Sequence, residues 1–297
     1  MPHVPTLVLV VRPWNPFRAL GSTVMRGLQL ADMVRPFLEG RLNVRVLPFR
    51  PDIAPARALA ALLPNGAVVV FVKFAGDGWT PDRLAPVRRR AAAVGLDVVD
   101  LPLSEAPLDL FDFYISASMS GRRALQDALA ARGRGATPVA LLHHHADPRL
   151  DGAEPPADRG FGCLYLGARE NTIIPPALGD DVDVLEVRNA QDFAANLGRI
   201  GAYSLHFAVR APAEPDEGAE RSYKPFTKGM TAAKCRANVL VNRDADDVED
   251  LLGADYPFLA AGCADEDIAA TFELARSAFG GGDWRDAQAK VQDIDGL

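Results

Sequence analysis

A short cationic segment is the part of this sequence best suited to bind an anion. Lys224, Thr227 and Lys228 lie in the run KPFTK, Arg210 ends an alternating apolar run before it, and small residues such as Thr231 follow. This pattern predicts a helix after the turn, with Thr227 as its N-cap. The unpaired first amides of a helix and its dipole both favour phosphate or carboxylate. The alternative is a solvated basic turn before an ordinary helix.

Other polar residues accompany two apolar runs that are predicted to be strands. His206 lies in the run that Arg210 ends, and Asn242, Arg243 and Asp244 close the run that follows the small-residue helix. Open parallel sheets bind ligands at the carboxyl ends of their strands. We therefore expect His206 to orient phosphate or sugar, and the three residues from Asn242 to Asp244 to recognise hydroxyl groups.

The N-terminal half offers a second group of candidates. Gly21 and Ser22 follow the first predicted strand and precede a long helical pattern, and Lys73 and Asp77 follow the third predicted strand. A strand, a glycine-bearing loop and a helix in that order form a ligand-binding crevice. No G-x-G-x-x-G and no Walker A motif is present, so a dinucleotide or nucleoside-triphosphate site is not indicated. A plain glycine turn is the alternative.

Three adjacent histidines, His143, His144 and His145, are the most conspicuous cluster. Neighbouring residues of an extended chain point to opposite faces, so at most two of them could reach one metal ion. No H-x-x-x-H motif or pair of cysteines supports them, and we predict no metal site. Because the run ends a predicted strand, we expect His144 to act as a base or hydrogen-bond donor.

The arrangement of these elements predicts an α/β protein. Apolar runs and helical patterns alternate along the chain, and 297 residues favour two medium-sized domains with parallel sheets. We expect one Rossmann-like domain over residues 1–135 and a second over 136–280, facing each other across a cleft. A last helix over 281–297 is expected to cross back to the first domain.

Composition excludes several classes of protein. The net charge of −7 argues against nucleic-acid binding. Three dispersed cysteines without C-x-x-C spacing argue against a disulfide framework and favour a reducing compartment. The first apolar run is too short to span a membrane and lacks the features of a signal peptide, so a cytoplasmic location is expected.

One basic helix could still bring the protein to a membrane surface. Arg83 and the run from Arg88 to Arg90 precede a strand that is predicted over 97–101. Such a cationic face can attract anionic lipids peripherally. A solvated helix face is the simpler interpretation, and we favour it.

The run KPFTKGMTAAKCRANVLVNRD, followed by LGADYPFL, resembles the donor-binding half of GT-B-fold glycosyltransferases. LLHHHADPRL at 141–150 and GCLYLGARENTIIP at 162–175 fit the same half, and the N-terminal half is similar in layout only. There are two departures: Arg236 stands where such blocks often have glycine, and the E-x7-E pair of many retaining members is not apparent.

The resemblance implies a hexosyltransferase whose N-terminal domain holds the acceptor and whose C-terminal domain holds a nucleoside-diphosphate-sugar. It places Gly167 and Asn171 in a loop that faces this donor. The donor is a substrate, no cofactor or metal is implied, and the acceptor would be a glycan, a lipid or a small molecule. Lys228 and Arg210 are then expected to stabilise the leaving diphosphate.

Two other functions remain open from the sequence. The first is a non-catalytic protein that binds a nucleotide-sugar on the same fold, which would bind donor without turnover. The second is a metal-dependent hydrolase that uses the run His143–His145 together with Asp147. Stoichiometric metal in the purified protein would distinguish the hydrolase from the other two.

Overall fold

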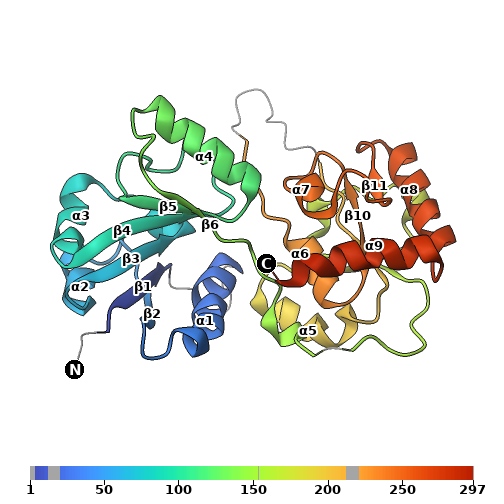
Figure 1. Cartoon of the computed structure of the whole chain (residues 1–297), viewed down its shortest axis with the longest axis horizontal. Coiled ribbons are helices and arrows are strands. Elements are labelled where there is room, and N and C mark those ends of the chain that lie inside the picture. Colours follow the sequence, from blue (N-terminus) through green and yellow to red (C-terminus); the bar gives the residue numbers. More distant parts are fainter. Residues whose placement is uncertain (1–3, 13–20, 153, 212–220, 297) are drawn as a thin grey trace. The chain divides into compact units, whose positions relative to one another are not determined.

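A computed structural model describes residues 4–12, 21–152, 154–211 and 221–296. The chain divides into two compact units. The first unit comprises Met1–His143 and Pro215–Pro225, and the second comprises His144–Glu214 and Phe226–Leu297. Figure 1 shows a strand-and-helix layering within each of them.

The first unit is built on a six-stranded parallel sheet with the order β2-β1-β3-β4-β5-β6. Its strands are β1 (Thr6–Val11), β2 (Asn43–Pro48), β3 (Ala67–Val72), β4 (Ala91–Val98), β5 (Phe113–Ser116) and β6 (Val139–Leu141). The runs in β1 and β3 are continuously apolar and almost wholly buried. That pattern is typical of parallel strands that are covered on both faces.

The helices of the first unit lie on both faces of its sheet (Figure 1). They are α1 (Leu30–Leu38), α2 (Ala56–Leu62), α3 (Pro81–Arg88) and α4 (Met119–Ala131), with a π-helical segment η1 (Thr23–Gln29) and a 3-10 turn η2 (Lys73–Gly76). The larger core includes Leu59, Leu84 and Leu125 from α2, α3 and α4, whereas Ala31 of α1 belongs to a separate core. The connection from β1 to β2 runs along the sheet in one direction, and the connections from β2 onward run in the opposite direction. Because such crossovers are right-handed, α1 lies on the face of the sheet opposite to α2, α3 and α4.

The strand predicted over 97–101 begins earlier than expected. β4 already starts at Ala91 and ends at Val98. It pairs with β3 through Ala67 opposite Ala91 and, after a shift in register, from Val68 opposite Ala93 onward. β4 begins with alanines, which have little preference for strands, so the local sequence did not predict that the strand starts at Ala91. Pairing with β3 decides the conformation, and Gly95 gives room for the Phe113 ring, which a Cβ at this position would strike.

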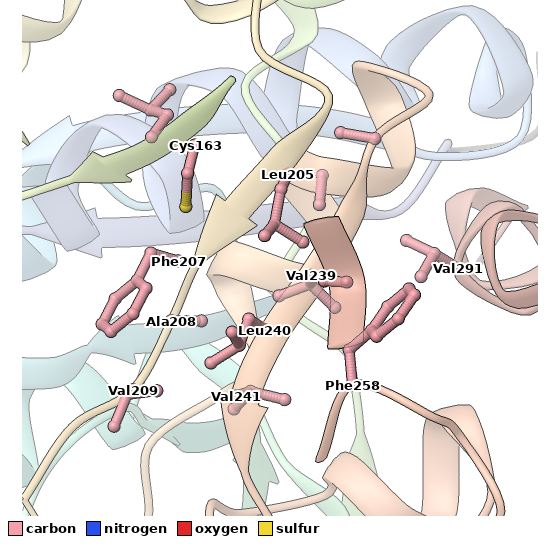
Figure 2. Close-up of a cluster of buried hydrophobic side chains, with 14 of the residues drawn as sticks. Cys163, Leu205, Phe207, Ala208, Val209, Val239, Leu240, Val241, Phe258 and Val291 are labelled. Carbon is pink, nitrogen blue, oxygen red and sulfur yellow. The ribbon is translucent and has the colours of Figure 1, made fainter. Parts of the chain in front are cut away.

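The second unit has a five-stranded parallel sheet with the order β11-β10-β9-β7-β8. The strands are β7 (Cys163–Leu166), β8 (Val182–Leu185), β9 (Leu205–Phe207), β10 (Asn238–Asn242) and β11 (Leu259–Ala260). The helices are α5 (Ala190–Ile200), α6 (Thr227–Lys234), α7 (Val248–Leu252), α8 (Asp265–Ala278) and α9 (Gly282–Gln292), with 3-10 turns η3 (Pro148–Leu150), η4 (Arg169–Asn171), η5 (Pro176–Leu178) and η6 (Asp293–Gly296). Figure 2 shows side chains of its core, among them Phe207, Val239 and Phe258.

The two parallel sheets confirm the predicted α/β fold class, but the division of the chain differs from the expected one. The first unit continues to His143 and also takes up Pro215–Pro225. The last helix, α9, packs within the second unit, where Trp284, Ala287 and Val291 join the core beside α6 and β10. These three residues are three and four positions apart, so they form one apolar face of α9, which is buried in the second unit. Among the described residues, no helix is long and apolar enough to cross a membrane.

Candidate anion site of the second unit

The first turn of α6 brings a lysine to the end of strand β7. The Lys228 ammonium lies over the Tyr165 ring, 4.9 Å from its centroid. Gly167 follows β7 with a φ of +146°, and a Cβ there would be 3.0 Å from the Tyr165 hydroxyl and 3.5 Å from Lys228 Nζ. The backbone conformation favours glycine at this position, and the close approach of the Tyr165 hydroxyl leaves little room for a Cβ.

Tyr165 is held in place as a neutral phenol. Its hydroxyl donates to the carbonyl of Ala168 at 3.0 Å. Burial raises the pKa of Tyr165 to about 12, and the nearby carboxylates of Glu170 and Glu186 act in the same direction. The ring thus presents an uncharged face to the Lys228 ammonium, an arrangement that cation–π attraction stabilises.

The helix α6 begins one residue earlier than predicted. Thr227 is its first helical residue, and Phe226 occupies the N-cap position without a side-chain cap. The prediction of Thr227 as the N-cap is wrong because the Phe226 ring packs over Gly229 and fixes the start of the helix. The Thr231 hydroxyl donates to the carbonyl of Thr227 at 3.0 Å. Because the Phe226 side chain makes no capping hydrogen bond, the first-turn amides of α6 are suited to an anion.

A second group forms where β9 and β10 end. The backbone amide of Arg210 donates to Asn242 Oδ1 at 3.0 Å, and Asn242 Nδ2 donates to Asp244. The Arg210 guanidinium lies 3.4 Å from Asp246, whose side chain is fully buried. Asn242 thereby fixes the backbone at which Arg210 leaves the sheet. Arg243 is exposed and pairs with Glu249 at 2.5 Å.

The loop after β7 is tied to the chain after β9. The Thr172 hydroxyl donates to the carbonyl of Val209 at 2.6 Å, and Arg169 donates to the carbonyl of Thr172 at 3.1 Å. Asn171 ends η4 on the exposed side of this loop. The connections from β7 and β8 run in opposite directions along the sheet, so β7 and β9 flank its topological switch point. Ligands of open α/β sheets bind at this point.

His206 lies within β9 and is deeply buried. It is 3% exposed, and its Nε2 is buried without a hydrogen-bond partner among the described residues. Burial, aided by the positive charge of Arg159, lowers the pKa of His206 to about 4. The imidazole is therefore neutral at physiological pH. The predicted contact of His206 with phosphate stays a prediction, and this environment does not supply a positive charge for it.

The run His143–His145 does not form a metal site with Asp147 in the described structure. His144 is buried, and its ring centroid lies 5.8 Å from that of His145. Asp147, the further ligand that a hydrolase would use, is bound by Arg149 at 2.7 and 2.9 Å. Across the described part of the chain, no group of three histidine, cysteine or acidic residues is placed to hold a metal ion.

In the first unit, charged residues follow the strands on either side of its own switch point. Lys73 follows β3 with a φ of +47°, and its ammonium lies 3.6 Å from Asp100, which has a φ of +52°. Arg12 follows β1 and lies 3.7 Å from Asp77. Burial raises the pKa of the Asp77 carboxyl. Left-handed non-glycine residues are costly and often cluster at ligand sites.

The other N-terminal candidates take simpler positions. Gly21 is exposed with open space around its Cα, and Ser22 precedes η1 without capping it. Lys224 is exposed in the segment that belongs to the first unit, whereas Lys228 belongs to the second. The run KPFTK is thus divided between the two units.

The sequence did not indicate several of the residues that complete these groups. They are Tyr165 beneath Lys228, Asp246 beside Arg210, Arg12 beside Asp77 and Asp100 beside Lys73. Most of these pairs join segments that are far apart in the chain. Only the position of Arg12 directly after the first apolar run offered a signal.

Comparison with known proteins places this geometry in a structural class. No protein-family model and no curated protein sequence matches the chain. HepE from Anabaena, solved in complex with UDP, is 12% identical, with 98% of this chain and 94% of that chain covered and a TM-score of 0.59. A glycosyltransferase from Rickettsia africae is 10% identical, covers 98% and 94%, and has a TM-score of 0.60.

A trehalose 6-phosphate synthase from Burkholderia multivorans gives the same result. It is 10% identical, with 99% of this chain and 95% of that chain covered and a TM-score of 0.60. Nearly the whole chain therefore has the GT-B fold that the sequence resemblance implied. At this level of identity the comparisons define the fold, and function depends on the site.

Proposed function

We propose that this protein is a glycosyltransferase of the hexosyltransferase type that uses a nucleoside-diphosphate-sugar donor. The position of Lys228 carries the proposal. Lys228 belongs to the first turn of α6, and its ammonium lies beside Gly167 at the end of β7. A full positive charge, the free amides of a helix N-terminus and a glycine loop therefore lie next to the switch point between β7 and β9. This combination suits the negative charge of a diphosphate. The similar structure of HepE was solved with UDP.

In this proposal, protein groups stabilise the leaving diphosphate, and no metal or cofactor is needed. Transfer breaks the bond between the anomeric carbon and a diphosphate oxygen, and negative charge accumulates on the departing group. Lys228 and the first-turn amides would balance this charge, with help from Arg210 at the end of β9. Preorganised charges of this kind can supply a large part of a rate enhancement.

Further residues would bind the two substrates. We assign the donor to the second unit, where Gly167, Asn171, Thr227, Thr231, His206, Asn242, Arg243 and Asp244 are the candidate contacts, with Lys224 from the neighbouring segment. We assign the acceptor, a glycan, a lipid or a small molecule, to the first unit through Gly21, Ser22, Lys73 and Asp77. His144 would take the proton of the acceptor hydroxyl. We place the reaction in the cytoplasm, without nucleic acid and with peripheral membrane contact as an option for a lipid acceptor.

A thermal-shift screen tests the proposal. The purified protein is heated with UDP, GDP, dTDP, CMP or ADP and with their sugars, with and without EDTA. We expect one nucleoside diphosphate to raise the melting temperature, and the increase to survive chelation. Stabilisation that requires a metal, or none with any nucleotide, would contradict the proposal. If donor binds but no sugar is released or transferred, the protein is a non-catalytic binder.

A further inference from the structure

The segment 221–226, called the strap here, runs from the first unit into the second, which begins again at Phe226. Ser222 forms an antiparallel bridge with Pro102, and Tyr223 packs against the larger core of the first unit. A Cβ on Gly121 would lie 3.1 Å from the Tyr223 Cβ, so that Tyr223 lies against the start of α4. The Arg221 guanidinium covers the Tyr223 ring at 5.0 Å.

The other end of the strap is anchored in the second unit. Phe226 is 6% exposed, belongs to the core of that unit and lies against Gly229 of α6. Only Lys224 and Pro225 separate the two aromatic anchors. Three residue steps span at most about 11 Å, and Pro225 stiffens both itself and Lys224. The strap is therefore short and stiff.

A second described connection between the units, at His143, is also held by the first unit. Arg26 of η1 is fully buried, and its Nη1 donates to the carbonyls of Leu142 and His143 at 2.8 and 3.0 Å. The same guanidinium binds Asp97 of β4 at 2.8 and 2.9 Å. Since Pro102 follows β4 in the chain, β4 and its following loop hold both connections.

We propose that Tyr223 is a positioning residue, through which a ligand at the first turn of α6 is coupled to the first unit. Lys228 is in the same turn that Phe226 anchors, five positions after Tyr223. When a diphosphate restricts the motion of this turn, the motion of the strap is restricted as well. Tyr223 then restricts the motion of the Ser222–Pro102 bridge and of the start of α4. The inference rests on the proposed function, because it takes the ligand of α6 to be a diphosphate.

Hydrogen–deuterium exchange of the full chain tests this coupling. The probes are UDP and inorganic pyrophosphate, which carries the diphosphate without a base. We expect ligand to slow exchange in α6, in 221–224 and in 98–106, by about tenfold, a common size for coupling between sites. In Pro225→Gly and Tyr223→Ala the effect on 98–106 should be lost while that on α6 remains. Tyr223→Phe keeps the ring and should behave like the wild type.

Each outcome separates the coupling from the proposed function. Slowed exchange in α6 alone, or an equal effect on 98–106 in Pro225→Gly, would overturn the coupling and leave the anion site standing. No change in α6 with either probe would overturn the proposed function and the coupling with it. If Tyr223→Ala melts far below the wild type, Pro225→Gly decides, since it leaves both anchors in place.

Discussion

At the scale of single residues, the environment of each charged or titratable group defines what it can contribute. The Lys228 ammonium lies over the neutral Tyr165 ring, whereas the Arg210 guanidinium lies beside the buried carboxylate of Asp246. His206 is buried so completely that it has lost its ordinary basicity. Lys228 and Arg210 can therefore bring positive charge to an anion, whereas a neutral His206 could contact one only through a hydrogen bond.

The burial of His206 predicts a specific dependence of stability on pH. Its pKa is about 4 in the folded protein, against about 6.5 in the unfolded chain. Below about pH 6.5 the unfolded state binds a proton that the folded state does not, so stability falls as pH falls towards about pH 4. From about pH 7 to about pH 5 this amounts to roughly 2 kcal/mol.

Urea denaturation of the wild type and of His206→Gln at both pH values measures this effect. The variant lacks the titrating group, so its free energy of unfolding should decrease less between the two conditions. The comparison cancels the contributions of the acidic side chains, which both proteins share. Equal decreases in the two proteins would show that His206 is not held in its neutral form.

At the scale of elements, the turn from α6 to β10 holds Arg236 in a backbone conformation that favours glycine. Arg236 follows the end of α6 with a φ of +49°, a conformation that glycine adopts without cost. Its side chain pairs with Glu154 at 2.6 and 3.0 Å, and its carbonyl accepts from Arg159 at 2.5 Å. The departure lies at the C-terminal end of α6, whereas Lys228 is at the other end.

Two substitutions at position 236 separate the cost of the backbone from the ion pair. Both Arg236→Gly and Arg236→Ala remove the exposed pair with Glu154, which is worth little. Only glycine relieves the left-handed strain, so Arg236→Gly should be more stable than Arg236→Ala by about 1 kcal/mol. Thermal or urea unfolding of the two variants checks this. Equal stabilities would mean that the turn relaxes in both.

At the scale of the whole molecule, patterns within short stretches predicted the fold, and long-range pairing determined the rest. The apolar runs at β1, β3 and β10 indicated parallel strands, and both sheets confirm this. Pairing with β3 extends β4 back to Ala91. The Ser222–Pro102 bridge and the Tyr223 anchor assign the strap to the first unit. Neither has a local signal.

The candidate site was predictable to the same extent. Lys228, Arg210 and Asn242 were predicted because each stands next to a strand or helix end in the sequence, and Gly167 because of the family resemblance. Tyr165 and Asp246 were not predicted, since their roles depend on partners from other elements. The run KPFTK is divided between two units by tertiary packing, which a short sequence motif does not predict.

The most direct test of the account is calorimetric titration of nucleoside diphosphates into the wild type and Lys228→Ala, with EDTA present. We expect the wild type to bind one of them and Lys228→Ala to lose about 1.5–3 kcal/mol, roughly 10- to 100-fold in Kd, as for hydrogen bonds to charged groups. Lys228→Arg keeps the charge and should retain most of the affinity. An unchanged Kd in Lys228→Ala, or binding that EDTA abolishes, would contradict the diphosphate site at α6.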